Sequence, residues 1–279
     1  MAETVKFSNQ RFLSVVMPAY NEEATLREIV GRVLELDSLL ELIIVDDCSK
    51  DKTPEIAEGL ANADERVRYV RQPVNGGKTE ALKTGFSLTK GEIVIVQDAD
   101  LEYDPSEIAD VIMPIATGRA DVVYGSRFMV KRAARVLYFY HYLANKGLTF
   151  LSNCVTNLNM SDVETCYKAF RGDIIRNMTI TSSGFGFEIE VTAKVAKLKC
   201  AVYEVPISYY GRTYAEGKKI GFKDGVAALF YILKYNWLTN LKESYREIPK
   251  TLLEEKSNLV ANFTRVEKVF TAKNAKDAK

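Results

Sequence analysis

The sequence lacks a long apolar segment and a recognisable export signal. Its longest apolar run, residues 226–233, ends at Lys234, far short of the roughly 20 residues that a membrane-spanning helix needs. Residues 1–10 are polar, with no basic stretch followed by an apolar one, which is not the pattern of a signal peptide. We therefore expect neither a transmembrane anchor nor export.

The sequence also lacks an excess of charge of one sign. The chain has 38 basic and 37 acidic residues and a net charge of +1, so no long-range field attracts nucleic acid. An anionic ligand must therefore be held by a local arrangement of side chains. The only histidine, His141, cannot build a metal site from several histidines.

Cysteine is scarce and widely spaced. The four residues, Cys48, Cys154, Cys166 and Cys200, show neither CxxC nor metal-ligand spacing, which favours free thiols over a disulfide framework or a zinc site. A reducing compartment fits this usage. We expect a cytoplasmic protein, either free or peripheral on the cytoplasmic face of a membrane.

What is present is an alternation of short β-rich runs with longer amphipathic ones between residues 13 and 125. This βαβ series predicts an α/β fold with a mostly parallel sheet flanked by helices. We expect an N-terminal arm over residues 1–10, one Rossmann-like domain over 11–238, and a charged C-terminal extension over 239–279 whose end is disordered.

The second half is less regular. We expect a helix over residues 135–160, a loop and strand over 162–172, and helices from Phe185 to Lys197 and from about Lys223 to Trp237, with a strand from Tyr203 to Tyr210 between them. Earlier in the chain, Thr53 before Pro54 and Asp104 before Pro105 indicate helix starts, the latter with Glu107 placed for a capping box.

Polar residues follow three of the predicted strands, at 18–22, 46–49 and 98–102. In open α/β sheets, ligands bind beyond the carboxyl ends of the strands. Asp98 and Asp100, separated by one residue after an apolar strand, can face a divalent ion together, and their hard oxygen ligands suit Mg²⁺ or Mn²⁺ bound also to a diphosphate. The alternative is a helix-capping loop whose aspartates are merely solvated.

A second acidic pair, Asp46 and Asp47, also ends a strand and can accept hydrogen bonds from a ribose or a base edge. Two acidic strand ends predict one nucleotide site. The sequence Gly77-Lys78-Thr79 resembles the end of a P-loop, but Gln72 stands where that motif requires glycine, which argues strongly against an NTPase. We expect this loop to approach a phosphate through Gly76 and Gly77.

The sequence resembles a known family. The motifs VVMPAYNEE, IIVDDCSKDKT, NGGKTEALKTG, VIVQDADLEYDP and VVYGSRF, within residues 12–128, have the order and spacing of family 2 glycosyltransferases with the GT-A fold. DVETCYKAFR, FGFEIEV and YEVPISYYGRTYAEGKKIGFKDG extend the likeness to about residue 235 and are similar to the polyprenyl-phosphate sugar synthases, such as the dolichol-phosphate mannose synthases. The resemblance implies inverting transfer of mannose or glucose from a GDP- or UDP-sugar to a polyprenyl (dolichyl-type) phosphate.

The resemblance also implies site residues on the donor side. The positions that would line the nucleotide are Pro18, Tyr20, Glu22 and Asp47, and we assign Asp46, Gly76, Gly77, Lys78, Asp98 and Ala99 to the same donor site. Asp98, Asp100 and Glu102 would hold the metal. Glu102 departs from the glutamine usual in the mannose synthases, so the donor or metal geometry is expected to differ there.

On the acceptor side, the resemblance implies that Arg127, Arg212 and Lys218 are phosphate-side cations, and it places His141, Asn145 and Lys146 around the acceptor phosphate. Without it, His141 is interpreted as an aromatic on a helix face. Asp100, Arg127, Arg212 and Glu188 are our catalytic candidates. Glu188 would act as base only if the acceptor is a hydroxyl, and Glu190, two residues on, would then face solvent.

Other functions remain open. The acceptor can be a soluble or protein-linked glycan, or the chain can be an inactive nucleotide-sugar-binding protein, although its two aspartates weigh against the latter. For a lipid acceptor, residues 222–238 combine aromatic residues, including Phe222, Phe230, Tyr231 and Trp237, with flanking lysines, as an interfacial helix does. The alternative is a core helix that closes the domain.

Overall fold

The structure is a computed structural model that describes residues 11–129, 138–184, 186–211, 222–249 and 252. Its strands are β1 (Leu13–Ala19), β2 (Leu39–Asp46), β3 (Val67–Arg71), β4 (Ile93–Val96), β5 (Val122–Ser126), β6 (Lys168–Arg171) and β7 (Val202–Pro206). Its α-helices are α1 (Leu26–Leu34), α2 (Thr53–Ala63), α3 (Lys78–Leu88), α4 (Ile108–Ala116), α5 (Phe139–Thr156), α6 (Gly172–Asn177), α7 (Phe187–Leu198), α8 (Phe222–Leu233) and α9 (Leu241–Ser244). A 3₁₀ turn (Pro105–Glu107) precedes α4, and a π-helical turn (Lys234–Leu238) extends α8.

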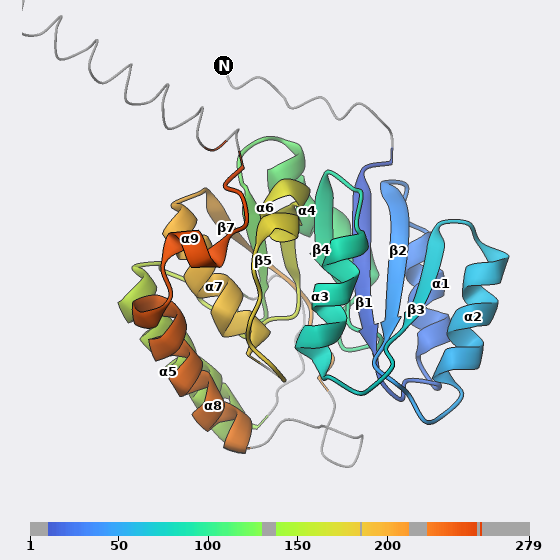
Figure 1. The fold of residues 1–279 in the computed structure, drawn as a ribbon, viewed down its shortest axis with the longest axis horizontal. Coiled ribbons are helices and arrows are strands. Elements are labelled where there is room, and N and C mark those ends of the chain that lie inside the picture. Colours follow the sequence, from blue (N-terminus) through green and yellow to red (C-terminus); the bar gives the residue numbers. More distant parts are fainter. Residues whose placement is uncertain (1–10, 130–137, 185, 212–221, 250–251, 253–279) are drawn as a thin grey trace, which may run out of the picture.

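The strands form one sheet of seven in the order β3-β2-β1-β4-β6-β5-β7 (Figure 1). All neighbouring pairs are parallel except those of β6, which runs antiparallel to both β4 and β5. The predicted mostly parallel sheet is confirmed. The antiparallel direction of β6 was not predicted, because a short buried strand carries no sign of its direction.

The central strands are apolar because both of their faces are covered. On one face Ile43 and Val45 of β2 pack against Ala81 of α3, while on the other face Leu42 and Ile44 belong to the main core with α1. Gly85 allows α3 to lie this close, since a Cβ there would come within 2.3 Å of a Val16 methyl group. The ends of these strands are therefore held in place by a rigid sheet.

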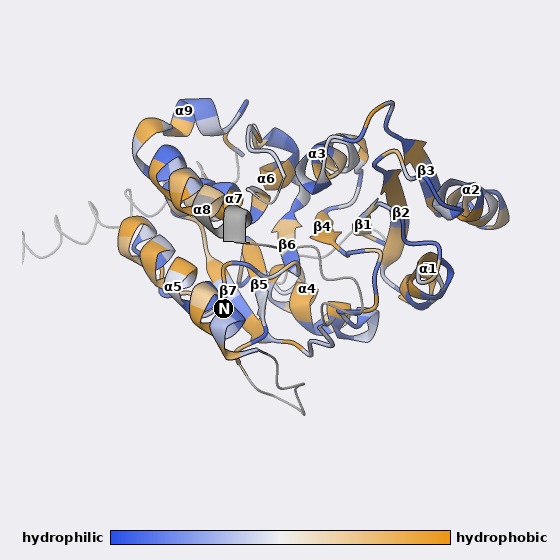
Figure 2. Cartoon of the chain, turned by 90° about the horizontal axis from the view of Figure 1, so that it is seen from below, coloured by the Kyte–Doolittle hydropathy of each residue, from blue (hydrophilic) through white to orange (hydrophobic). Residues whose placement is uncertain are grey.

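The helices form two layers (Figure 2). Helices α3 and α6 lie over one face of the sheet and α1 and α4 over the other. Phe86 of α3 stacks on Phe187 of α7 with ring centroids 5.7 Å apart, which extends the first layer toward α5 and α8. Those two helices contact each other at the end of the molecule opposite α2 (Figure 1).

The local helix-start signals were partly correct. Helix α2 begins at Thr53 with Pro54 in its first turn, and the Asp104 carboxylate accepts from the backbone N–H of Ser106. The capping box predicted for Glu107 is wrong. Its carboxylate instead accepts from the backbone and hydroxyl of Ser208, at 2.7 and 2.9 Å, and ties the segment after β7 to the start of α4.

The later elements occur near their expected positions. Helices α5, α7 and α8 and strand β6 all lie within or close to the predicted ranges, and β7 ends at Pro206 rather than at Tyr210. Within the part of the chain that the structure describes, no helix is both long and apolar enough to span a membrane. The N-terminal arm and the end of the C-terminal extension lie outside the described residues.

Candidate active site

The candidate site lies where the parallel strands end. The chain enters β1 at the top of Figure 1, so the carboxyl ends of the parallel strands lie at the lower edge of the sheet in that view. Because β1 pairs with both β2 and β4, the segments 18–22, 46–49 and 98–102 meet there, as predicted.

The turn after β1 is fixed by hydrogen bonds to its neighbours. The backbone N–H groups of Asn21 and Glu22 donate to the hydroxyls of Ser49 and Thr53, at 2.9 and 2.8 Å. The hydroxyl of Thr25 donates to the carbonyl of Ala99 at 2.9 Å. Two other predicted nucleotide residues, Pro18 and Tyr20, are half-buried on the same strand end.

Asp46 is an internal residue. Its carboxylate is fully buried and accepts from the backbone N–H of Ser49 at 2.9 Å and from the Tyr69 hydroxyl at 3.1 Å, and Arg71 lies 3.4 Å away. Burial, and then the charge of Asp46, raise the pKa of Tyr69 to about 12. In this structure, the Asp46 carboxylate therefore stabilises the end of β2 through hydrogen bonds inside the protein.

Asp47 holds the glycine loop. Its two carboxylate oxygens accept from the backbone N–H groups of Gly76 and Gly77, at 2.8 and 2.7 Å, and its carbonyl accepts from the Asn75 amide. Gly77 has φ of +84° and is the N-cap of α3, a conformation that favours glycine. The loop amides thus bind Asp47 here, and this clasp fixes where Lys78 begins the helix.

Asp98 and Lys78 form an ion pair at the centre of the site. The Lys78 Nζ lies 2.9 and 3.0 Å from the two oxygens of Asp98 and 3.6 Å from Oε1 of Glu188 on α7. Burial alone would lower the pKa of Lys78, but the charges of Asp98 and Glu188 hold it well above its usual range. The thiol of Cys166 is also hydrogen-bonded to Asp98, and its pKa is raised, chiefly by burial.

Asp100 lies beside this pair, largely buried, and accepts from the backbone N–H of Glu102 at 3.1 Å. Glu102 turns toward the segment after β7, where its carboxylate accepts from the Tyr209 hydroxyl at 3.0 Å and its carbonyl from the backbone of Tyr210. Among the described residues, no three His, Cys, Asp or Glu side chains are grouped as metal ligands. The predicted trio of Asp98, Asp100 and Glu102 is therefore not assembled here.

Two aspartates still suit a nucleotide-bound ion. Mg²⁺ is typically held by one or two carboxylates, with substrate phosphates and water completing its coordination. Asp98 and Asp100 supply hard oxygen donors of that kind beside the strand ends that are predicted to bind the nucleotide. The chemistry of the donor set fits Mg²⁺ or Mn²⁺.

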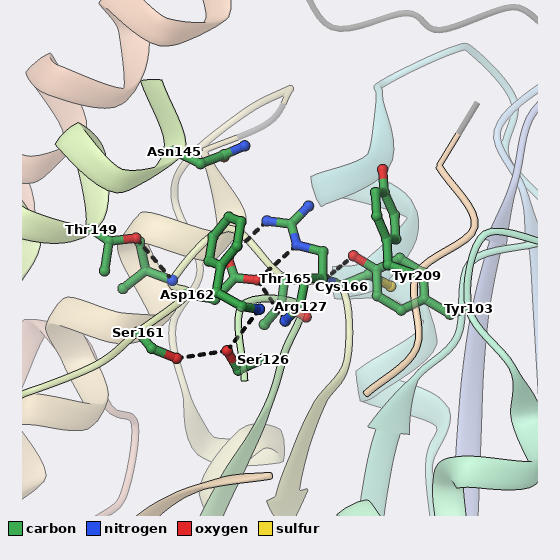
Figure 3. Close-up of polar contacts among 12 residues, drawn as sticks. Tyr103, Ser126, Arg127, Asn145, Thr149, Ser161, Asp162, Thr165, Cys166 and Tyr209 are labelled. Atoms are coloured by element: carbon green, nitrogen blue, oxygen red, sulfur yellow. Dashed lines mark hydrogen bonds and ion pairs between the residues drawn. The ribbon is translucent and has the colours of Figure 1, made fainter. Parts of the chain in front are cut away.

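Arg127, directly after β5, is held by Asp162 (Figure 3). The buried Asp162 carboxylate accepts from Nε and Nη2 of Arg127, each at 2.7 Å, and from its backbone N–H at 3.1 Å. The guanidinium also lies 5.2 Å from the ring centre of Tyr209. Burial opposes ionisation of both groups, but their attraction outweighs it, raising the pKa of Arg127 and lowering that of Asp162.

The loop before β6 contains functional candidates that sequence reasoning missed. Glu164 and Thr165 each have a buried oxygen without a hydrogen-bond partner, as does Glu188. Burial, and then the charge of Glu188, raise the pKa of Glu164 to about 7. Lys168 is fully buried and donates to the carbonyls of Val163 and Thr165. The sequence did contain a signal for these candidates, namely the ionisable residues within the largely apolar segment DVETCYKAF.

Glu188 lies in the first turn of α7 and faces Lys78, as a site residue should. The expectation that Glu190 faces solvent is wrong. It is fully buried and accepts from the backbone of Thr181 and Ser182, at 2.8 and 2.7 Å, and from Lys194. Neighbouring elements cover α7 on both sides. Glu190 is therefore enclosed, and its contacts stabilise the fold.

The acceptor candidates on α5 separate into two groups. Lys146 donates to the carbonyl of Ser161 at 3.1 Å and lies 4.5 Å from the ring centre of Phe128, whereas the Asn145 side-chain amide donates at 3.0 Å to the carbonyl of His141 on its own helix. His141, one turn earlier, packs edge-on against Tyr138. The other two cations, Arg212 and Lys218, lie outside the described residues.

Comparison with known proteins agrees with this architecture. The model of a family described as glycosyl transferase family 2 matches residues 14–179. That range runs from the second residue of β1 through β6, and it includes the carboxyl ends of β1, β2, β4 and β5.

Three curated relatives have similar sequences. Polyprenol monophosphomannose synthase of Mycolicibacterium smegmatis is 29% identical over 214 residues, 74% of this chain and 80% of the relative. Undecaprenyl-phosphate mannosyltransferase of Micrococcus luteus is 28% identical over 212 residues, 74% of this chain and 86% of the relative. Dolichol-phosphate mannosyltransferase of Pyrococcus furiosus is 29% identical over 216 residues, 75% of this chain but 59% of the relative.

Solved structures of glucosyl-3-phosphoglycerate synthase from Mycobacterium tuberculosis have the same fold. One superposes with a TM-score of 0.64 at 21% identity, covering 81% of each chain. Another, a complex with Mn²⁺, UDP and phosphoglyceric acid, gives 0.62 at 20% identity, covering 82% of this chain and 80% of that one. The GT-A architecture expected from the sequence is confirmed.

Proposed function

Because this chain belongs to glycosyl transferase family 2, we propose that it transfers a hexose, mannose or glucose, from a GDP- or UDP-sugar to a polyprenyl phosphate. The observation that carries the proposal is the cluster of Asp98, Asp100, Lys78 and Glu188 at the carboxyl edge of the sheet. The names of the three relatives, each of which joins a mannosyl group to a polyprenyl-type lipid phosphate, support the choice of acceptor.

On the donor side, Asp98 and Asp100 would hold Mg²⁺ or Mn²⁺, which neutralises the charge of the departing diphosphate when bound. The other contacts to the donor would come from groups of the protein. Lys78 supplies a cation 2.9 Å from Asp98, within reach of the same diphosphate. The turn after β1 and the clasped glycine loop frame the nucleotide.

On the acceptor side, a lipid phosphate is already an anionic nucleophile near neutral pH, so its attack needs no general base. Arg127 and Lys146 place two cations on this side, and both are held by hydrogen bonds. We assign Arg212 and Lys218 to the same role from the sequence. With a sugar hydroxyl as acceptor, Glu188 would take the proton.

A lipid acceptor also requires contact with a membrane surface, and α5 and α8 supply a face for it. This aromatic face consists of Phe139, Tyr140, Leu143 and Phe150 of α5 and Leu229, Phe230, Leu233, Trp237 and Leu238 of α8 and its π-helical turn, all exposed. Ala228 and Ile232 of α8 are buried. The helix therefore packs inward on one side and presents aromatic residues on the other, which combines the interfacial and core-helix expectations.

The test is a transfer assay with labelled GDP-mannose and UDP-glucose, each offered with a polyprenyl phosphate or a soluble glycan, with and without EDTA. We expect label in the lipid fraction for one donor, lost on chelation. Label in the soluble glycan would indicate the hydroxyl-acceptor alternative and a catalytic role for Glu188. Donor binding without release of sugar from either acceptor would indicate an inactive binding protein.

A further inference from the structure

Lys78 has an unusual position for a residue at the start of a helix. Its ammonium lies between carboxylates from two other elements, within 3.0 Å of both oxygens of Asp98 after β4 and 3.6 Å from Glu188 on α7. The side chain is about four-fifths buried. A lysine that only solubilised the helix would extend into water.

The backbone of Lys78 is fixed from two sides. Before it, the backbone N–H groups of Gly76 and Gly77 donate to the two oxygens of Asp47. After it, the hydroxyl of Thr79 donates at 2.9 Å to the carbonyl of Gly184, in the turn that leads into α7. The end of β2 and the approach to α7 thus hold Lys78 against Asp98, and only its side chain is left to move.

This contact occupies the carboxylate assigned to the metal. Lys78 approaches both oxygens of Asp98, at 2.9 and 3.0 Å. An ammonium paired with a carboxylate in this way carries its positive charge near neutral pH. A divalent ion that takes an oxygen of Asp98 meets this charge at close range and must displace it, because like charges repel strongly at a poorly hydrated site.

We propose that Lys78 competes with the divalent ion for Asp98, so that metal binding releases its ammonium toward Glu188 and the donor diphosphate. This inference rests on the proposed function, since it takes Asp98 as a metal ligand. Before the ion arrives, Lys78 neutralises Asp98 and joins it to Glu188. Afterwards, the same cation is available to the leaving group. Lys78 is then a positioning residue that links metal occupancy to the donor.

The proposal predicts opposite effects of one substitution on two measurements. Lys78→Gln removes the competing charge, so Mn²⁺ should bind about fivefold to tenfold more tightly, as expected from removal of one partly buried ion pair. Transfer should nevertheless slow, because the diphosphate loses a cation. A residue needed only for folding would weaken both.

The experiment is a titration of the intact protein with Mn²⁺, in which free ion is followed by electron paramagnetic resonance. Lys78→Arg keeps the charge and should bind Mn²⁺ like wild type. Lys83→Gln is the matched control, since Lys83 lies on the same helix and pairs only with Glu80 at 2.6 Å among the described residues. Asp98→Asn reports on the metal site itself, and thermal unfolding checks that each variant is folded.

The outcomes separate the inference from the function on which it rests. Tighter binding in Lys78→Gln alone supports competition, including the case in which wild type binds too weakly to measure. If Asp98→Asn loses Mn²⁺ while Lys78→Gln binds like wild type, the competition is refuted and the metal assignment stands. If none of the folded proteins binds Mn²⁺, or Asp98→Asn binds it like wild type, the metal assignment fails and the inference fails with it.

Discussion

The guanidinium of Arg127 and the carboxylate of Asp162 meet through two parallel hydrogen bonds of 2.7 Å, and the backbone N–H of Arg127 donates a third to the same carboxylate. Such a fork is among the stronger polar contacts available to a protein. It fixes the direction of a cation for which the family resemblance implies phosphate binding. It also makes Arg127 part of the fold.

Arg127→Ala should therefore reduce stability as well as activity. The substitution leaves the fully buried carboxylate of Asp162 without its partner, which costs about 3 kcal/mol when one member of a buried ion pair is removed. We expect the free energy of unfolding, measured by urea denaturation, to fall by about that amount. Turnover should be compared at equal folded fractions.

The exposed pair of Arg32 and Glu28 provides the control. Arg32→Ala should change the free energy of unfolding by less than about 1 kcal/mol. The double variant Arg127→Ala, Asp162→Ala should lose less stability than the sum of the single variants, because the second change removes the orphaned charge. Strict additivity would show that the two groups do not interact.

Asp100→Asn should reduce transfer by about 100-fold or more, since it removes a charged metal ligand. This carboxylate is largely buried and accepts from the backbone of Glu102. Asparagine keeps that hydrogen bond, whereas Asp100→Ala also loses about 1 kcal/mol of stability. Asp104→Asn, in the same loop, is the activity control. Near-normal transfer by Asp100→Asn at saturating Mn²⁺ would refute the metal assignment.

Glu164 should make stability depend on pH. Its pKa is raised from the usual 4.5 to about 7, so the folded chain binds this proton more tightly than the unfolded one. The stabilisation is fully present below pH 4.5 and is lost as pH rises through 7. Glu164→Gln cannot ionise, so its free energy of unfolding relative to wild type should rise by about 2 kcal/mol between pH 5 and pH 8.

The control for this titration is Glu58→Gln, on the exposed side of α2. Its stability should follow that of wild type across the same pH range. A constant difference between Glu164→Gln and wild type would mean that Glu164 ionises normally in the folded protein.

Membrane contact through the aromatic face should be measurable by sedimentation with anionic liposomes at low and moderate salt. Wild type should sediment with the vesicles, and less so at moderate salt, because lysines near the face contribute. Trp237→Ser combined with Lys234→Glu should weaken binding several-fold, and Phe150→Ser should weaken it through α5.

Met113→Ser provides the control, since Met113 is an exposed apolar residue on α4. This substitution should leave vesicle binding unchanged. Wild type that stays in the supernatant at both salts would indicate a soluble acceptor or a separate membrane partner. Equal binding by the double variant and wild type would remove α8 from the contact.

The fold was largely predictable because its main signals are local. Apolar runs such as Ile93–Val96 are followed by polar residues that mark a strand end, and Pro54 marks a helix start. The antiparallel direction of β6 was not predictable, since it is set by pairing with strands far away in sequence. The partner of Glu107 was missed for the same reason, because Ser208 lies 101 residues later.

The donor half of the candidate site could be predicted from sequence because its residues follow strands directly, as Asp47 and Asp98 do. Their contacts were not predictable. Nothing local shows that Asp47 binds the amides of Gly76 and Gly77, or that Lys78 reaches Asp98. Buried acids such as Glu164 were overlooked because sequence position alone does not report burial.

The reversed direction of β6 has a practical consequence for protein engineering. Since β5 ends at the carboxyl edge and the antiparallel β6 starts there, the chain between Ser126 and Lys168 leaves and rejoins the sheet at one edge. This excursion contains Arg127, Asp162 and all of α5, while β1 to β4 precede it. Its two ends are natural graft points. Under the proposed function, we expect an excursion exchanged between related family members to change the acceptor preference while leaving the proposed donor half unaltered.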